Sequence, residues 1–433
     1  ERGGEVVFFG RFDELLACPG SLTGAYLRGE APPPPAPPPD TLPARRRPPA
    51  AAAPAEPAYI DILGAAEHNL KSLDVRIPLR RLVCVTGVSG SGKSSLVQDV
   101  LFNGLCKLRQ KPVDSVGRHR ELVGHESLAD VVLVDQSPIG RTTRSNPASY
   151  VGAFDAIRRL YAEEPLARER GFHAGTFSFN AGTGRCPTCN GNGFQRIEMQ
   201  FLSDVYLRCP DCDGRRFRPE VLDVTLNGKS IADTLDMTVS EACVFFAGRP
   251  AVRRGLDPLR AVGLDYLRLG QPVPTLSGGE AQRLKLAGHL ADSATGGRGP
   301  TLFLFDEPTT GLHFHDIAVL LAAFRALLDQ GHSLVVIEHN LDVIRAADWI
   351  IDLGPEGGEA GGEIVCAGPV EAVARCPRSH TGAALRAVPP RVSAHTGTGA
   401  ATPAPSGNAI RIHGAREHNL KSVNVSIPRD QFS

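Results

Sequence analysis

The pattern of apolar and polar residues predicts an α/β fold for the middle of the chain. An apolar run over 82–85 leads into a glycine-rich turn. Leu96, Val97 and Val100 follow that turn at the spacing of one helix face. We therefore expect a strand, a glycine-rich turn and a helix in immediate succession.

Five further segments have the pattern of strands. Apolar and polar residues alternate over 60–63 and 73–77, which predicts two antiparallel strands ahead of the glycine-rich turn. The segments 131–134, 301–305 and 334–337 are short apolar runs, as expected for buried strands. Each of these three runs is followed directly by an acidic residue, which makes the strand ends candidate positions for catalytic or ligand-binding residues.

Both ends of the sequence repeat parts of its middle. Residues 3–10 resemble residues 361–368, and residues 410–428 match residues 60–78 at 13 of 19 positions without a gap. The order of these matches places the tail of one unit first and the head of another unit last. We therefore predict one complete unit, flanked by two partial ones, within a tandem array.

A proline-rich stretch helps to set the domain boundaries. Residues 31–57 contain twelve prolines and cannot build an apolar core, so they are predicted to form a semi-rigid linker. The expected segments are a unit tail at 1–30, the linker at 31–57, the complete unit at 58–387, a second linker at 388–407 and a unit head at 408–433.

Length and composition limit the possible classes of protein. The 433 residues are enough for about two to four domains. Lys plus Arg and Asp plus Glu both number 47, so any surface for nucleic acid must be local. No apolar run approaches the roughly 18 to 20 residues needed to cross a bilayer, and no signal sequence is recognisable. We expect a cytoplasmic protein without membrane spans.

The turn GVSGSGKSS, residues 87–95, has the spacing of a phosphate-binding loop. Its glycines let backbone N–H groups approach phosphates, Lys93 would reach the β- and γ-phosphates, and Ser94 would ligate magnesium. An incidental Gly-Lys-Ser turn is the alternative, but the flanking strand and helix argue against it. The residues assigned to ATP in this loop are Gly87, Ser89, Gly90, Ser91, Gly92, Lys93, Ser94 and Ser95.

A second small-residue turn precedes a predicted helix at 281–290. Ser277, Gly278 and Gly279, followed by Glu280, form a turn at the helix N-terminus, which is again suited to a phosphate. These four residues are therefore candidates for nucleotide binding.

Four polar residues at strand ends are candidates for hydrolysis. Asp306 and Glu307 follow the strand at 301–305, where Asp306 would hold magnesium and Glu307 would polarise the attacking water. Gln136, after the strand at 131–134, is placed where it could touch both magnesium and water. His339 comes after the strand at 334–337, next to Glu338. Each alone is compatible with a surface position; together, after a phosphate-binding loop, they predict a nucleotide hydrolase.

Four of the ten cysteines form two CxxC pairs separated by nineteen residues. This spacing is typical of a zinc module, and Cys186, Cys189, Cys209 and Cys212 are the predicted ligands. The site is expected to be structural, because four thiolates leave no open position for a substrate. A redox dithiol is the alternative, but two pairs without thioredoxin-like surroundings argue against it.

Arginines are frequent before and within the cysteine-bearing segment. A solvated face explains any single one, whereas together they are a candidate phosphate-contacting surface, with salt-sensitive and sequence-independent binding. They are Arg141, Arg144, Arg158, Arg159, Arg168, Arg170, Arg185, Arg196, Arg208, Arg215, Arg216 and Arg218.

Taken together, the motifs resemble those of ATP-binding cassette ATPases. Within that superfamily the cysteine-bearing insert, with SPIGRTTRSNP before it and LSGGEAQRLKLA and VIEHNLDVI after it, resembles UvrA, the damage-sensing ATPase family of bacterial nucleotide excision repair. Residues 59–387 resemble the second nucleotide-binding half of that family, residues 1–30 the end of its first half and residues 408–433 the opening of a first half.

The resemblance implies an α/β fold, in which a P-loop core is interrupted by a helical, zinc-binding signature region. The core would comprise residues 58–150 and 270–387, and the insert about 151–269. Two cassettes of this family pack so that the SGGE turn of one faces the P-loop of the other. Ser277 to Glu280 would therefore serve the ATP of a partner.

The resemblance also implies ATP, Mg²⁺ and Zn²⁺ as cofactors, a homodimer, and duplex DNA, especially damaged DNA, as a partner. Distorted sites would be handed to UvrB, through parts of the family's first half that are missing from this sequence. The alternative is a UvrA-like paralogue in drug or antibiotic resistance, binding DNA or drug without supporting incision. A cassette of a transporter or translation factor is a third reading, which the zinc insert opposes.

Overall fold

A computed structural model describes residues 4–30, 58–137, 139, 144–197, 205–294, 299–387, 409–416 and 420–429. The predicted linkers at 31–57 and 388–407, together with Arg141, lie outside the described residues. The chain forms two compact units, one of residues 36–386 and one that joins residues 1–35 with 387–433. In the described part of the chain no helix is long and apolar enough to span a membrane.

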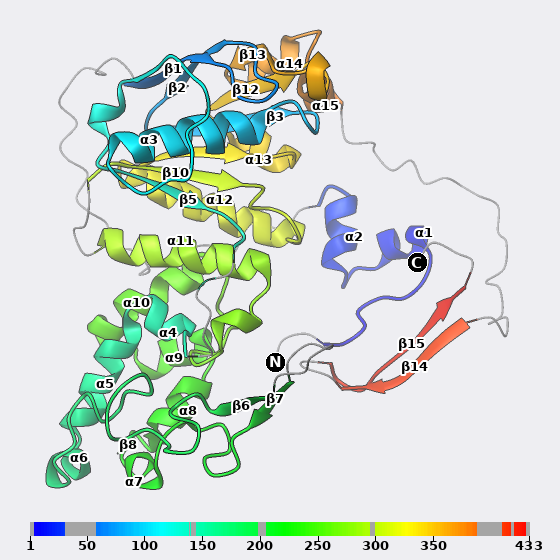
Figure 1. Ribbon diagram of the computed structural model, residues 1–433. Helices are drawn as coiled ribbons and strands as arrows, with labels where there is room; N and C mark the ends of the chain where they lie inside the picture. Colours follow the sequence, from blue (N-terminus) through cyan, green and yellow to red (C-terminus); the bar gives the residue numbers. More distant parts are fainter. Residues whose placement is uncertain are drawn as a thin grey trace. The chain divides into compact units, whose positions relative to one another are not determined.

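A six-stranded sheet forms the centre of the larger unit (Figure 1). Five of its strands are parallel and β13 is an antiparallel edge strand. The apolar runs expected to be buried strands are confirmed, since they lie in this sheet with both faces covered. In spatial order the strands are β13 (Glu363–Gly368), β12 (Trp349–Gly354), β3 (Leu82–Gly87), β11 (Ser333–Ile337), β10 (Thr301–Asp306) and β5 (Asp130–Val134).

A smaller antiparallel sheet lies against the same core, with strand order β2 (Leu73–Pro78), β1 (Tyr59–Ala65) and β4 (Glu121–Val123). The antiparallel pairing of β1 and β2 confirms the prediction made from alternation. The helical segment after the glycine-rich turn begins as a π-helix, η1 (Ser95–Phe102), and continues as α3 (Asn103–Leu108). Its apolar face packs into a cluster shared by both sheets.

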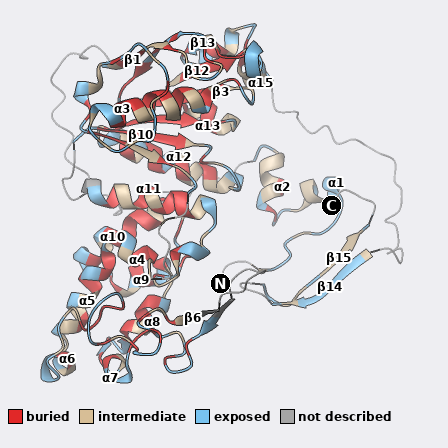
Figure 2. Ribbon diagram, in the orientation of Figure 1, coloured by how far each residue is buried: buried red, intermediate tan, exposed pale blue. Residues whose placement is uncertain are grey.

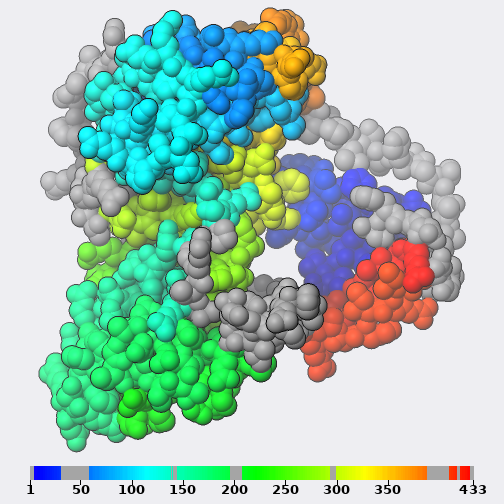
Figure 3. Space-filling model, in the orientation of Figure 1, coloured from blue at the N-terminus to red at the C-terminus, as the bar shows by residue number. Residues whose placement is uncertain are grey.

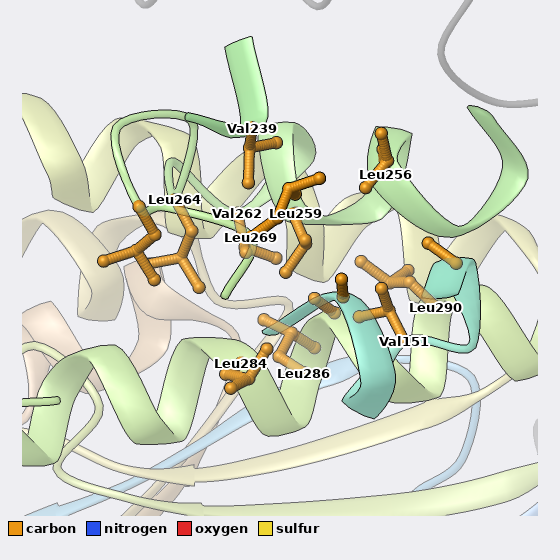
Figure 4. Close-up of a cluster of buried hydrophobic side chains, with 14 of the residues drawn as sticks. Val151, Val239, Leu256, Leu259, Val262, Leu264, Leu269, Leu284, Leu286 and Leu290 are labelled. Atoms are coloured by element: carbon orange, nitrogen blue, oxygen red, sulfur yellow. The ribbon is translucent and has the colours of Figure 1, made fainter. Parts of the chain in front are cut away.

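Helices cover the other face of the six-stranded sheet. They are α11 (Gly278–Ala294), α12 (Phe314–Asp329), α13 (Leu341–Ala346), α14 (Val370–Arg375) and α15 (His380–Arg386). Figure 2 shows the buried residues concentrated in the sheet and along α11. Leu284 and Leu290 of α11 also pack with Leu256 and Leu259 of the insert, so this helix belongs to both parts of the unit (Figure 4).

The insert is mainly helical, as expected. In Figure 3 it forms one continuous body with the P-loop core. Its helices are α4 (Pro147–Tyr150), α5 (Ala153–Glu163), α6 (Pro165–Glu169), α7 (Pro219–Leu222), α8 (Ile231–Asp236), α9 (Val239–Phe245) and α10 (Pro250–Ala261). Two short hairpins accompany them, β6 (Phe194–Ile197) with β7 (Val205–Arg208), and β8 (Thr225–Leu226) with β9 (Lys229–Ser230).

The smaller unit brings together two segments from opposite ends of the chain. Helices α1 (Phe12–Ala17) and α2 (Leu22–Leu27) come from the first segment, and the hairpin of β14 (Ala409–Ala415) with β15 (Val423–Pro428) comes from the second. The hairpin has the register of β1 with β2, including an irregularity at the equivalent position. The sequence repeat is therefore matched by a structural one.

The contact between these two segments also repeats one in the larger unit. Lys421 Nζ lies 3.0 Å from Glu5 Oε1, and Lys71 Nζ lies 2.8 Å from Glu363 Oε1. In each case the lysine N–H also donates to the carbonyl of the glycine before that glutamate, at 2.8 Å and 3.0 Å. The head and tail fragments thus meet each other as the head and tail of the complete unit do.

Candidate nucleotide site and four-cysteine centre

The glycine-rich turn connects β3 to η1 in a conformation that requires glycine. Gly87 has φ +133°, and a Cβ atom there would lie 2.0 Å from the carbonyl oxygen of Leu353. Lys93 is buried, and its Nζ donates to the carbonyl oxygens of Gly87 at 3.0 Å and Val88 at 2.8 Å. Burial lowers the pKa of Lys93, while the nearby carboxylates of Glu307 and Asp306 oppose that shift. The ammonium is thus held inside the turn, close to the acids that end β10.

The other residues predicted to bind ATP line the same turn. Ser89 and Ser94 are exposed, and Ser95 Oγ lies 3.0 Å from His68 Nδ1. The hydroxyl of Ser91 is fully buried and has no hydrogen-bond partner within the described chain. An unpaired buried hydroxyl beside the N-terminus of a helical segment suits a phosphate oxygen, so the turn fits a nucleotide.

The acids Asp306 and Glu307 follow β10 at the edge where the turn lies. Gln98 of η1 donates to Asp306 Oδ2 at 2.7 Å, so the P-loop helix contacts this carboxylate directly. Burial raises the pKa of Asp306, and the charge of Glu307 raises it further. Glu307 has φ +42°, which is unusual for a residue with a side chain, and its N–H donates to Ile337 at 3.0 Å. The backbone is therefore strained where the candidate general base stands.

Three strand ends bring the candidate hydrolytic residues together. Gln136 Nε2 donates to the carbonyl oxygen of Glu307 at 3.3 Å. The carboxylate of Glu307 lies 3.6 Å from His339 Nε2. Because β5, β10 and β11 are parallel neighbours, their carboxyl ends meet at one edge, as the ends of parallel strands must.

The SGGE turn forms the N-terminus of α11 and is closed by its own side chains. Ser277 N–H donates to Glu280 Oε2 at 2.8 Å, and Glu280 N–H donates to Ser277 Oγ at 3.3 Å. This is a capping box, and Tyr266 OH donates to the second carboxylate oxygen at 2.7 Å. A Cβ atom on Gly278 would lie 3.5 Å from the Gln136 side chain. The turn therefore stands beside the candidate hydrolytic residues, with Gly279 next to it in the helix.

Glu338 has a larger structural role than its position at a strand end suggested. It is 2% exposed and accepts N–H groups from Thr309 at 2.9 Å, His339 at 2.9 Å and Asn340 at 3.1 Å. One carboxylate thus fixes both the turn after Glu307 and the turn that carries His339. An acid ending an apolar run is the signal that could have identified it.

Two residues of α11 that face the sheet, Lys285 and Gln282, were not predicted from the sequence to have a role in the site. Lys285 Nζ pairs with the Asp135 carboxylate at 2.5 Å and lies 2.9 Å from Ser137 Oγ. Although burial opposes it, hydrogen bonds from Lys285 and Ser137 lower the pKa of Asp135. Gln282 donates to the carbonyl oxygen of Val134 at 2.9 Å. The helix that begins with the SGGE turn therefore also holds the loop that begins at Gln136.

The four paired cysteines converge at one point in the insert, as predicted. All four are buried, and their Sγ atoms lie within 4.8 Å of one another. The separations are 3.9 Å for Cys186 with Cys209 and 3.6 Å for Cys189 with Cys212. Tetrahedral zinc with bonds of about 2.3 Å separates its sulfurs by about 3.8 Å, so the cluster fits that ion. Burial raises the pKa of the Cys212 thiol to about 12.

Many arginines of the candidate DNA surface already have partners within the protein. Arg158 pairs with Asp155, and Arg170 pairs with Asp223 at 2.8 Å. Arg216 is buried, and burial lowers its pKa to about 10, which leaves it charged at neutral pH. The side chains of Arg141 and Arg196 lie outside the described part of the structure. DNA contact by this surface stays a prediction.

The chain is similar to known proteins along most of its length. It is 52% identical over 398 residues to UvrABC system protein A of Thermus thermophilus and 50% identical over 386 residues to that of Aquifex aeolicus. These matches cover 92% and 89% of the chain, which spans only 40% of each relative's own length. None of the family models compared with the chain matches it.

A solved structure has a similar fold over most of this chain. The crystal structure of UvrA2 from Deinococcus radiodurans is 45% identical, with a TM-score of 0.77, covering 89% of this chain and 44% of that chain. The resemblance to UvrA inferred from the motifs is therefore confirmed, as is the cassette fold.

Proposed function

We propose that this chain, which is homologous to the UvrA proteins along nine-tenths of its length, is part of an ATP-dependent DNA-binding ATPase. Its role would be to recognise damaged duplex DNA in nucleotide excision repair. The observation that carries the proposal is the meeting of Glu307, His339 and Gln136 at one sheet edge, where the helix after the glycine-rich turn also contacts Asp306. The buried four-cysteine centre in the same unit supports it.

The roles proposed at the nucleotide follow from the geometry. Backbone N–H groups of the turn and Lys93 would hold the phosphates, while Ser94 and Asp306 would bind magnesium. Glu307 would orient and polarise the attacking water, and His339, 3.6 Å from that carboxylate, would contact the γ-phosphate. Gln136, on the loop held by α11, would contact both magnesium and the attacking water.

The SGGE turn is assigned to a second nucleotide. Ser277 to Glu280 would close over ATP bound to a partner copy, since the turn is exposed at the start of α11. This assignment requires a second cassette, which a homodimer would supply. The capping box already uses the N–H groups of Ser277 and Glu280, so those of Gly278 and Gly279 would meet the incoming phosphate.

Zinc is the metal proposed for Cys186, Cys189, Cys209 and Cys212. Four thiolates supply a closed tetrahedral site, so the ion would hold the fold of the insert and take no part in hydrolysis. N–H groups of Gly193 and Arg216 donate to the sulfurs of Cys189 and Cys212 at 3.3 Å and 3.4 Å, as expected where thiolates carry charge.

The proposal extends to a cytoplasmic protein that delivers damaged sites to UvrB through parts of the family beyond this sequence. A resistance paralogue would share the ATP and zinc sites, so these sites do not separate the two functions. The relatives named UvrABC system protein A favour repair.

The test is binding to one duplex, with and without a single bulky adduct, at fixed salt and with ATP. Fixed salt is needed because phosphate contacts alone shift affinity by orders of magnitude. Preference for the adduct that increases with hydrolysable ATP would support damage recognition. Equal affinity for both duplexes, with ATP turnover intact, would favour the paralogue.

A further inference from the structure

Arg216 is buried against the four-cysteine centre in an unusual conformation. It is 5% exposed and has φ +73°, a conformation that few residues other than glycine adopt. Its guanidinium carbon lies 5.1 Å from the centroid of the Phe179 ring, so the group stacks on an aromatic face. The side chain therefore has a fixed place, although arginine is seldom buried without a charged partner.

No carboxylate pairs with Arg216 among the residues that the structure describes. The acidic groups that act on its charge are the thiols of Cys189 and Cys212, and its own N–H donates to Cys212 Sγ at 3.4 Å. Four thiolates around a divalent cation carry a net charge of about −2. A buried guanidinium beside them balances part of that charge, which accounts for its burial without a carboxylate.

The far end of the same side chain reaches the segment that directly follows the insert. Arg216 Nη2 donates to the carbonyl oxygen of Gly270 at 2.9 Å. Gly270 lies on the segment that enters the SGGE turn, and its N–H donates to Leu235 at 2.7 Å. Three residues further on, Val273 N–H donates to Ser145 at 2.8 Å. Arg216 is therefore one of the contacts that fix the chain leading into Ser277.

A second contact joins the centre to the loop after β5. Arg144 Nε donates to Asn192 Oδ1 at 2.9 Å, and Asn192 N–H donates to the carbonyl oxygen of Cys189 at 2.9 Å. Arg144 comes eight residues after Gln136 in the chain. The loop after β5 and the segment entering the SGGE turn both border the candidate nucleotide site, and both are thus hydrogen-bonded to the cysteine-bearing turns.

We propose that Arg216 is a positioning residue, which transmits the state of the four-cysteine centre to the segment entering the SGGE turn. With metal bound, the negative thiolates hold the guanidinium between Phe179 and Gly270. Without metal, the four sulfurs are no longer drawn to one point, the turn that carries Cys212 and Arg216 is released, and the hold on Gly270 loosens. The inference rests on the zinc assignment proposed above and is independent of the DNA partner.

The test compares Arg216→Met and Arg216→Lys with the matched control Arg215→Met, because Arg215 is adjacent in sequence but exposed. Zinc content and the rate of zinc transfer to a chromogenic chelator report on the metal centre. Hydrogen exchange of residues 268–280, measured with zinc bound and after its removal, reports on the segment entering the SGGE turn. Neither readout depends on ATP turnover.

In the wild type and Arg215→Met, zinc removal should speed exchange of residues 268–280 by at least about tenfold. In Arg216→Met, exchange should be fast with zinc present and insensitive to its removal, and zinc transfer should be faster. Arg216→Lys should keep more zinc than Arg216→Met yet lose the protection, because a single ammonium cannot both stack on Phe179 and reach Gly270.

Zinc-dependent protection in Arg216→Met equal to that in Arg215→Met would overturn the proposal. If Arg216→Met does not fold, the lysine variant decides, and wild-type protection in that variant rejects the positioning role. A wild-type chain that holds no zinc would reject the zinc assignment and this inference with it. If the preference for the adduct is absent while zinc content and hydrogen exchange behave as expected, the proposed damage recognition is rejected and the role of Arg216 stands.

Discussion

Replacing Glu338 by Gln should loosen two turns of the candidate nucleotide site at once. The carboxylate accepts three N–H groups, of which the one from Thr309 goes to Oε1 and those from His339 and Asn340 go to Oε2. An amide has one acceptor oxygen. If that oxygen takes the place of Oε2, the Thr309 N–H faces an NH₂ group and is left unsatisfied.

The size of the effect follows from the burial of the site. Glu338 is 2% exposed, so water does not replace the lost acceptor. An unsatisfied buried donor costs about 1–3 kcal/mol, which corresponds to roughly 5- to 150-fold faster opening of the local hydrogen bond. Because Thr309 follows Glu307 in the same turn, ATP turnover should also fall.

Native-state hydrogen exchange of the Thr309 amide measures this change locally, without unfolding either unit. The control is Glu359→Gln, since Glu359 is an exposed acid on a surface turn. Exchange at Thr309 that is equally slow in both variants would refute the reasoning that one buried carboxylate holds the two turns.

Three further outcomes are expected. Glu307→Gln should abolish ATP turnover and spare ATP binding, measured by turnover and equilibrium nucleotide binding; full turnover would remove the general-base assignment. Lys285→Met should remove an ion-pair contribution of no more than about 1 kcal/mol above the unfolded pKa of Asp135, about 3.9, because the aspartate is 40% exposed. Since the folded pKa is lowered, this contribution should vanish as pH falls through it, and a loss of stability of the same size at neutral and acidic pH would exclude the ion pair. Lys421→Glu should weaken the contact between the two ends of the chain and adding Glu5→Lys should restore it, as followed by exchange of residues 409–415; no recovery in the double variant would show that the pair is not specific.

The sequence predicted those parts of the fold that depend on local pattern or exact spacing. The strand at 301–305 and the helix at 281–290 follow from their apolar residues, and both lie inside β10 and α11. The four cysteines were grouped correctly because metal-ligand spacing constrains them strongly. Strand β12 was not predicted, and the residues of β13 were recognised only as part of the repeat at 361–368.

Contacts between distant segments were beyond sequence reasoning. Lys285 and Asp135 are 150 residues apart, and Arg216 and Gly270 are 54 residues apart. Nothing in the local pattern distinguishes Arg216, which is buried, from Arg215, which is exposed. Such pairs exist because the insert folds back on the core, so they become visible only when tertiary packing is known.

The repeated hairpin allows strand pairing, which follows the local pattern, to be compared with burial, which depends on distant segments. Ile60 and Ile62 are fully buried at 0% exposure, whereas the equivalent Ile410 and Ile412 are 50% and 41% exposed. The strand pairing is the same in both hairpins, so similar local sequences are accompanied by the same pairing. Burial differs because η1 packs on the first hairpin, and no helix of that kind covers the second within the described residues. The apolar face of a strand therefore predicts that a core is needed, while a segment elsewhere in the chain has to supply that core.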